Sequence, residues 1–109
     1  ASIDINTQEY RYVGYFTKLR QAIELVWSYP TQAARRGLKG RVMVRFAIKK
    51  GGQAHGVSIL KSSGYKILDH AIIEAIKLAS PFAPLPLGLN KEVLIVQGTF
   101  SYVLNRYYR

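Results

Sequence analysis

Apolar positions change their spacing along the chain, and each spacing predicts a different element. Between residues 9 and 28 they recur every three or four residues, which predicts an α-helix with one apolar stripe. We expect this stripe to pack against a sheet in the core; the alternative is a helix that binds a partner. The stripe consists of Tyr12, Tyr15, Phe16, Leu19, Ile23, Val26 and Trp27, and Lys18, Arg20, Gln21 and Glu24 fall mostly on the opposite side.

A short helical piece and a β-hairpin are predicted next. Pro30 suits the first position of a helix, and Gly37 suits its left-handed end. From residue 41 apolar and polar residues alternate strictly, which predicts a strand with one buried and one wet face. The glycines at 51–52 supply the positive φ values of a tight turn, and residues 57–61 form the return strand. The buried face of the first strand is formed by Val42, Val44, Phe46 and Ile48.

A second helix and a stiff elbow follow the hairpin. Residues 65–79 carry apolar residues at helical spacing. The segment 80–86 contains three prolines and cannot continue a helix, so we expect it to carry Phe82 and Leu85 over the end of the core. The inward face of the helix is formed by Leu68, Ala71, Ile72, Ala75, Ile76 and Ala79.

The last strand is predicted over residues 92–104, with two different faces. We expect one face to lie under the helices: Leu94, Val96, Gly98, Phe100, Tyr102 and Leu104. The more open face has Val93, Ile95, Gln97, Thr99, Ser101 and Val103.

These elements define a fold class and a domain organisation. Their order predicts an α+β two-layer sandwich, in which a three-stranded antiparallel sheet has helices packed on one face and an extra N-terminal helix. A chain of 109 residues makes one domain. We expect a disordered lead-in over residues 1–8, one domain over residues 9–104 (helix 9–28, core 29–104), and a basic, aromatic tail over residues 105–109.

Composition narrows the class of protein. Hydrophobic residues make up 49% of the chain, enough for a core, and the absence of cysteine excludes a disulfide scaffold and a thiolate metal site. No apolar run approaches the roughly 20 residues of a membrane-spanning helix, and no signal peptide is present. A start at Ala1 instead of Met suggests a fragment or processed chain, whose anchor we expect upstream.

The net charge of +10 favours a polyanionic neighbour such as nucleic acid, anionic lipid or a cell-wall polymer. The basic residues are dispersed, however, and their densest points are the doublets Arg35-Arg36 and Lys49-Lys50. Dispersed charge is more typical of a solvated surface than of a binding stripe.

Residues that could carry chemistry are few and scattered. Asp69 and His70 are adjacent on the predicted helix and do not face each other, and His55 lies beside the hairpin turn. The serines at 62 and 63 lack the context of a nucleophile elbow, and the glycines near residue 52 join two strands, which argues against a phosphate loop. The sequence therefore predicts neither an enzyme nor a cofactor or metal site.

From Tyr29 onward the chain carries a series of short motifs. They are Tyr29-Pro30, Ala33-Ala34, Gly37, Gly40, Val42-Met43-Val44-Arg45-Phe46, Ser62-Ser63-Gly64, Leu68-Asp69, Ala71, Ala75 and Pro81-Phe82-Ala83-Pro84-Leu85-Pro86. In this order and spacing they resemble the C-terminal domain of TonB-family proteins over roughly the last 80 residues, in a variant with an extra N-terminal helix. One departure is that family members have a Gln-Pro-rich approach before Tyr-Pro, whereas this chain has Glu-Leu-Val-Trp-Ser at residues 24–28.

The resemblance implies the periplasmic domain of an energy transducer in a Gram-negative bacterium, anchored in the inner membrane by a segment absent from this chain. Such a protein passes proton-motive force from an ExbB/ExbD-type motor complex, reached through that anchor, to active transport by outer-membrane receptors. It binds the TonB box, a short extended receptor segment, by adding it as a strand to the edge of its last strand. No catalysis and no cofactor are implied.

The same resemblance assigns the partner-binding residues. They are Tyr29 and Pro30 of the Tyr-Pro motif and the backbone of Ile95, Val96, Gln97, Gly98, Thr99, Phe100, Ser101 and Tyr102, with the side chains of Ile95, Gln97, Thr99 and Ser101 lining the peptide. Because no proline and no inward charge interrupt residues 93–104, the same edge could also pair two copies of the chain in a homodimer.

Two other interpretations stay open. One is a TolA-like or other envelope-spanning linker that binds a periplasmic protein or the cell wall. The other is a polyanion-binding module, in which Tyr107 and Tyr108 would stack on bases. Its basic residues would be Arg35, Arg36, Lys39 and Arg41. We expect a contact with cell-wall polymer as an accessory role at most, and no nucleic acid as a partner.

Overall fold

A computed structural model describes residues 2–4 and 12–104 of the chain. The described elements are, in chain order, β1 (Ser2–Asp4), α1 (Val13–Val26), α2 (Thr31–Arg35), β2 (Gly40–Lys49), β3 (Ala54–Lys61), α3 (Lys66–Ala79), the 3-10 helix η2 (Leu87–Leu89) and β4 (Val93–Tyr102). The predicted tail over residues 105–109 lies outside the described residues.

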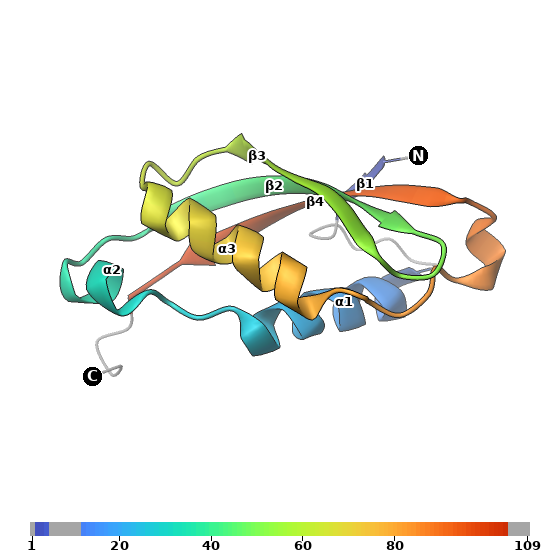
Figure 1. Cartoon of the computed structure of the whole chain (residues 1–109), viewed down its shortest axis with the longest axis horizontal. Helices are drawn as coiled ribbons and strands as arrows, with labels where there is room; N and C mark the ends of the chain where they lie inside the picture. Colours follow the sequence, from blue (N-terminus) through green and yellow to red (C-terminus); the bar gives the residue numbers. More distant parts are fainter. Residues whose placement is uncertain (1, 5–11, 105–109) are drawn as a thin grey trace.

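The sheet has the strand order β1-β4-β2-β3. β2 pairs antiparallel with β3 on one side and with β4 on the other, and the β2–β4 register runs without a break from Gly40 opposite Tyr102 to Lys49 opposite Val93. The helices α1 and α3 lie on the same face of this sheet, and the opposite face has no helix among the described residues (Figure 1). The predicted two-layer α+β sandwich with an extra N-terminal helix is confirmed.

β1 was not predicted. Residues 1–8 were expected to form a disordered lead-in, but Ser2–Asp4 form a strand that pairs in parallel with β4. Three residues are too few for an alternating pattern to be recognised in the sequence, and what makes them a strand is the neighbouring backbone of β4. The rest of the lead-in lies outside the described residues.

The core lies between the sheet and the helices, as the periodic pattern predicted. Phe16, Leu19 and Ile23 of α1 are buried, while Val26, also assigned to the apolar stripe, has 40% of its surface exposed at the helix end. The other buried core residues are Ala33, Val42, Val44, Phe46, Ile48, Leu68, Ile72, Ala75, Ile76, Phe82, Leu85, Leu94, Val96, Phe100 and Tyr102. The interpretation of α1 as a core helix is thus confirmed for most of its stripe.

The hairpin turn and the proline-rich elbow pack on each other. Of the two turn glycines, Gly52 alone has a positive φ, of 103°. The Phe82 backbone N–H donates a 2.7 Å hydrogen bond to the Gly52 carbonyl, and the Leu85 N–H donates a 3.0 Å bond to that of Lys50. These bonds hold Phe82 and Leu85 in the core, as predicted for the elbow. Pro30 is the N-cap of α2 and not its first helical residue.

Candidate partner-binding edge

One face of β4 is buried and the other is more open, as its sequence predicted. Within the strand, the residues from Leu94 to Tyr102 at even-numbered positions are buried beneath the helices. The alternate residues lie on the sheet face where the described part of the chain forms no helix, and they are half-buried or exposed: Val93, Ile95, Gln97, Thr99 and Ser101. Leu104 was assigned to the buried face but lies beyond the strand, with 38% of its surface exposed.

The two edges of β4 have different neighbours. Its inner edge pairs with β2 at all ten strand positions, whereas β1 pairs with its outer edge at three positions, opposite residues 95–97. The direction of the backbone groups follows from the Lys50 N–H, which donates a 2.9 Å bond to the Glu92 carbonyl just before the strand. Because these groups alternate in direction along a strand, those of even-numbered residues in β4 face β2 and those of odd-numbered residues face outward.

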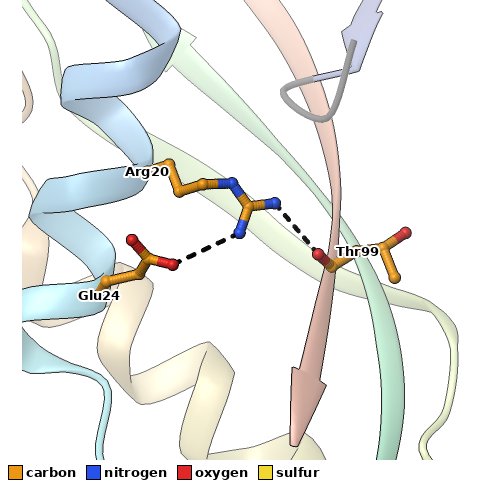
Figure 2. Close-up of polar contacts among 3 residues, drawn as sticks. All are labelled: Arg20, Glu24 and Thr99. Atoms are coloured by element: carbon orange, nitrogen blue, oxygen red, sulfur yellow. Dashed lines mark hydrogen bonds and ion pairs between the residues drawn. The ribbon is translucent and has the colours of Figure 1, made fainter.

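Arg20 of α1 binds the outer edge directly. Its Nη2 donates a 3.2 Å hydrogen bond to the Thr99 carbonyl, and its Nη1 lies 3.7 Å from an Oε2 of Glu24 one turn later (Figure 2). The guanidinium carbon also lies 4.9 Å from the centre of the Phe100 ring, in a cation–π contact. The segment that departs from the family pattern, residues 24–28, begins within this helix, and its Glu24 lies beside the Arg20 guanidinium that reaches the sheet edge.

The sequence pattern did not reveal this role of Arg20. Arg20 was assigned to the side of the helix opposite the apolar stripe, yet it is half-buried. It directly follows the buried Leu19 and lies three residues before the buried Ile23, so it borders the stripe. A basic residue at such a border can lay its aliphatic part along the core and project its charge past it, which is the signal that could have been used.

An aromatic cluster joins the C-terminal end of β4 to α3 and to the segment that precedes α2. The Tyr102 hydroxyl donates a 2.8 Å bond to the Leu68 carbonyl and accepts a 2.7 Å bond from the Trp27 indole N–H. The rings of Trp27 and Tyr29 pack edge-to-face on the Tyr102 ring, with centroids 4.9 and 5.1 Å away. Burial is the main reason that the pKa of Tyr102 is raised to about 12.

The predicted Tyr-Pro residues lie in this cluster and the adjoining turn. The Tyr29 hydroxyl donates to the Leu38 carbonyl, and the Pro30 carbonyl accepts a 3.0 Å bond from the Ala34 N–H. Both residues are half-buried, and their contacts fix α2 against the end of β4. The structure thus places them near Tyr102, at one end of the predicted edge, and gives each a structural role there.

Asp69 holds the loop between β3 and α3. Its carboxylate accepts hydrogen bonds from the Ser62 hydroxyl and from both the backbone N–H and the hydroxyl of Ser63, the latter two at 2.9 and 2.7 Å. Partial burial raises the pKa of Asp69, but the hydrogen bonds from the two serines outweigh that effect, so the pKa lies below its usual value.

The remaining candidate groups are spread over the surface. His70 is exposed, with its Nε2 3.8 Å from an Oε1 of Glu74, and His55 is exposed on β3. Among residues 2–4 and 12–104, His, Asp and Glu form no group of three that could hold a metal ion. No helix in the described ranges is both long enough and apolar enough to cross a membrane.

Comparison with known proteins identifies the class to which this sheet and its helices belong. The family described as Gram-negative bacterial TonB protein C-terminal matches residues 27–104. The chain therefore belongs to the family of TonB C-terminal domains.

Individual relatives agree with this assignment. A Protein TonB of Helicobacter pylori (strain J99) is 38% identical over 72 residues, which are 66% of this chain and 26% of the relative. A Protein TonB of Pasteurella multocida is 36% identical over 82 residues, 75% of this chain and 32% of the relative. The chain thus matches about a quarter to a third of the length of these relatives.

A solved structure extends the similarity to the fold. The solution NMR structure of the Helicobacter pylori TonB C-terminal domain has a TM-score of 0.73 and 32% sequence identity, covering 85% of this chain and 83% of that one. The solution NMR structure of the Pseudomonas aeruginosa TonB C-terminal domain has a TM-score of 0.62 and 25% identity, covering 72% and 79%.

Proposed function

We propose that this domain is the receptor-binding end of a TonB-like energy transducer, and that it binds the TonB box of outer-membrane receptors by strand addition to the outer edge of β4. On this proposal the rest of the protein anchors the domain in the inner membrane, contacts an ExbB/ExbD-type motor complex and passes proton-motive force to active transport. Membership of the TonB family supports this function over that of a TolA-like linker.

The observation that carries the proposal is the difference between the two edges of β4. The strand has ten residues, all of them paired with β2, while β1 matches three positions on the outer side. The outward backbone groups of Ile95 and Gln97 lie on that side, and a strand on this edge already exists in the form of β1. These features support the addition of an extended segment to this edge.

Backbone pairing also sets the expected affinity and specificity. A net contribution of about 1 kcal/mol per hydrogen bond, over a handful of bonds and with some side-chain burial, corresponds to a Kd on the order of micromolar. Because backbone groups carry most of this free energy, receptor segments of different sequence can bind. Ile95, Gln97, Thr99 and Ser101 would then contact alternate side chains of the peptide from the uncovered face of the sheet.

Peptides with selectively methylated backbones test strand addition. The isotope-labelled domain is titrated with a receptor N-terminal peptide, and we expect amide shifts concentrated between Ile95 and Tyr102. N-methylation of alternate peptide residues removes the N–H donors on one side of the added strand. Two peptides are compared, one methylated at odd-numbered and one at even-numbered residues. Methylation on the side that faces β4 should abolish binding, and methylation on the other side should leave binding intact, because only one set of donors faces β4. Equal affinity of both methylated peptides would exclude strand pairing.

A cell-wall contact is a second candidate, supported by the uncovered face of the sheet. Arg41, Arg45 and Lys49 are exposed at every fourth position of β2, all on one face, and the exposed Lys61 pairs opposite Met43 on the same face. Binding of an anionic polymer to this face would weaken steeply with added salt. Sedimentation with purified cell wall should therefore fall between 50 and 200 mM salt (about a fourfold increase in ionic strength). At a fixed salt concentration, the double variant Arg41→Gln, Arg45→Gln should sediment less with the cell wall than the double variant Arg35→Gln, Arg36→Gln.

A further inference from the structure

The outer edge of β4 is engaged by two other parts of the same chain. β1 lies along residues 95–97, with Ile3 opposite Val96. Two positions beyond Gln97, the Arg20 guanidinium binds the Thr99 carbonyl. Both contacts involve the edge to which the proposed function assigns the receptor peptide.

The register places Ile3 at the centre of the β1 contact. Val96 is even-numbered, so its backbone groups face β2, while those of its neighbours Ile95 and Gln97 face outward. The hydrogen bond from Arg20 to the carbonyl of odd-numbered Thr99 agrees with this alternation. In a parallel pair, a residue opposite an inward-facing position bonds to the residues on either side of it. The Ile3 N–H therefore faces the outward carbonyl of Ile95, and the Ile3 carbonyl faces the outward N–H of Gln97.

We infer, on the basis of the proposed function, that Ser2–Asp4 is an intramolecular occupant of the peptide site. A receptor segment that adds to β4 needs the outward backbone groups at Ile95 and Gln97, and β1 uses that same stretch of edge. The two strands exclude each other there, because each outward group faces one neighbouring strand. β1 thus competes with the partner and covers part of an edge that would otherwise pair with other chains.

The lengths of the competing strands make this occupant displaceable. β1 matches three positions of β4, whereas the strand offers ten. A receptor segment that extends further along the edge forms more backbone hydrogen bonds than β1 does. β1 offsets its shortness because it is tethered to the domain, which gives it an effective concentration on the order of millimolar. β1 can therefore pair with the edge of β4 when no peptide is bound, and a longer peptide can displace it.

Proline at position 3 tests the competition in the full chain. Ile3→Pro removes the N–H at the centre of the β1 contact, and Ile3→Val keeps it and serves as the matched control. If β1 is paired in about nine molecules of ten, its removal tightens the apparent Kd of a competing peptide about tenfold. In the absence of peptide, we expect faster hydrogen exchange at the Gln97 amide in Ile3→Pro, because the Gln97 N–H faces the Ile3 carbonyl, and unchanged exchange at Val96, whose backbone groups face β2.

Two peptide probes separate this competition from the proposed function. The first is a synthetic peptide with the sequence of residues 1–8, Ala-Ser-Ile-Asp-Ile-Asn-Thr-Gln. It should shift the amides of residues 95–97 in Ile3→Pro and bind the wild-type chain and Ile3→Val about tenfold more weakly. The second probe is a receptor N-terminal peptide, which should show the same order of affinities.

Each outcome points to a different conclusion. If the first peptide binds as expected and receptor peptides bind none of the three proteins, β1 occupies the edge and the receptor function is wrong. If receptor peptides bind all three proteins with equal affinity, receptor binding stands and competition by β1 is refuted. Equal hydrogen exchange at the Gln97 amide in Ile3→Pro and Ile3→Val would also refute the occupancy.

Discussion

Replacement of Gly52 by alanine should destabilise the fold far more than the loss of one glycine in a turn usually does. A Cβ at position 52 would lie 2.0 Å from the Phe82 carbonyl oxygen, and Gly52 has a φ of 103°, which disfavours any side chain. The elbow would have to move by about an ångström or more. That movement breaks the 2.7 Å hydrogen bond from the Phe82 N–H to the Gly52 carbonyl and withdraws the buried Phe82 ring from Phe46.

The expected loss in the free energy of unfolding has a backbone contribution and a packing contribution. A positive φ at a non-glycine residue costs about 1–2 kcal/mol. Loss of the hydrogen bond adds about 1 kcal/mol, and partial exposure of Phe82 adds about 1–2 kcal/mol. Gly52→Ala should therefore lower the free energy of unfolding by about 3–5 kcal/mol, the sum of these contributions.

Gly56→Ala is the matched control. Gly56 also has a positive φ, of 64°, but its added Cβ would have no heavy atom within 4 Å, so it reports the backbone part alone, about 1–2 kcal/mol. Urea unfolding followed by circular dichroism gives both values, provided that the m-values agree. If Gly52→Ala is no more destabilising than Gly56→Ala, the close packing of the elbow on the turn is wrong.

Three further perturbations test other contacts of the domain. Tyr102→Phe removes a hydroxyl that bonds to Leu68 and Trp27, and it should lower the free energy of unfolding by about 2 kcal/mol. Tyr65→Phe, at an exposed tyrosine, should change it by less than about 0.5 kcal/mol, and equal effects in thermal unfolding would contradict the role of Tyr102. Because the pKa of Asp69 is lower in the folded chain, its stabilising contribution is complete above the unfolded pKa of about 3.9 and is lost as the pH falls through the folded value. Asp69→Asn should therefore lose less stability than the wild type between about pH 5 and pH 2 in urea titrations, and parallel curves would argue against this linkage. Arg20→Ala should cost about 1 kcal/mol through the lost bond to Thr99 and the contact with Phe100, whereas Lys18→Ala, at an exposed position, should be nearly neutral in the same unfolding assay.

If β1 competes with the receptor peptide, receptor binding and protection of the edge from self-association are linked. A domain whose edge is covered in the resting state is protected from pairing with other copies of itself, a hazard for any long strand edge. The predicted homodimer through the last strand would then also require the displacement of Ser2–Asp4. Ile3→Pro should accordingly raise the dimer fraction in sedimentation experiments if the edge is used for self-association, while Ile3→Val should not.

The sequence by itself determined the core and the order of the main elements. Burial in helices and strands repeats with local periods, so the alternation of Val42, Val44, Phe46 and Ile48 and the helical spacing around Ile72 identified the faces that are buried. The glycine at 37 and the prolines within 80–86 marked the places where helices end, through their backbone preferences alone. Each of these signals depends on residues within a few positions of one another.

Only the tertiary structure decided what happens at the edge of β4. Ser2–Asp4 become a strand because the backbone of residues 95–97 lies beside them, and backbone pairing leaves no pattern in three side chains. Arg20 meets Thr99 across 79 residues of chain, and Trp27 meets Tyr102 across 75. Contacts of this kind depend on where the packed elements bring distant segments together. A local pattern can therefore identify β4 as a strand, but it cannot identify the segment that pairs with its outer edge.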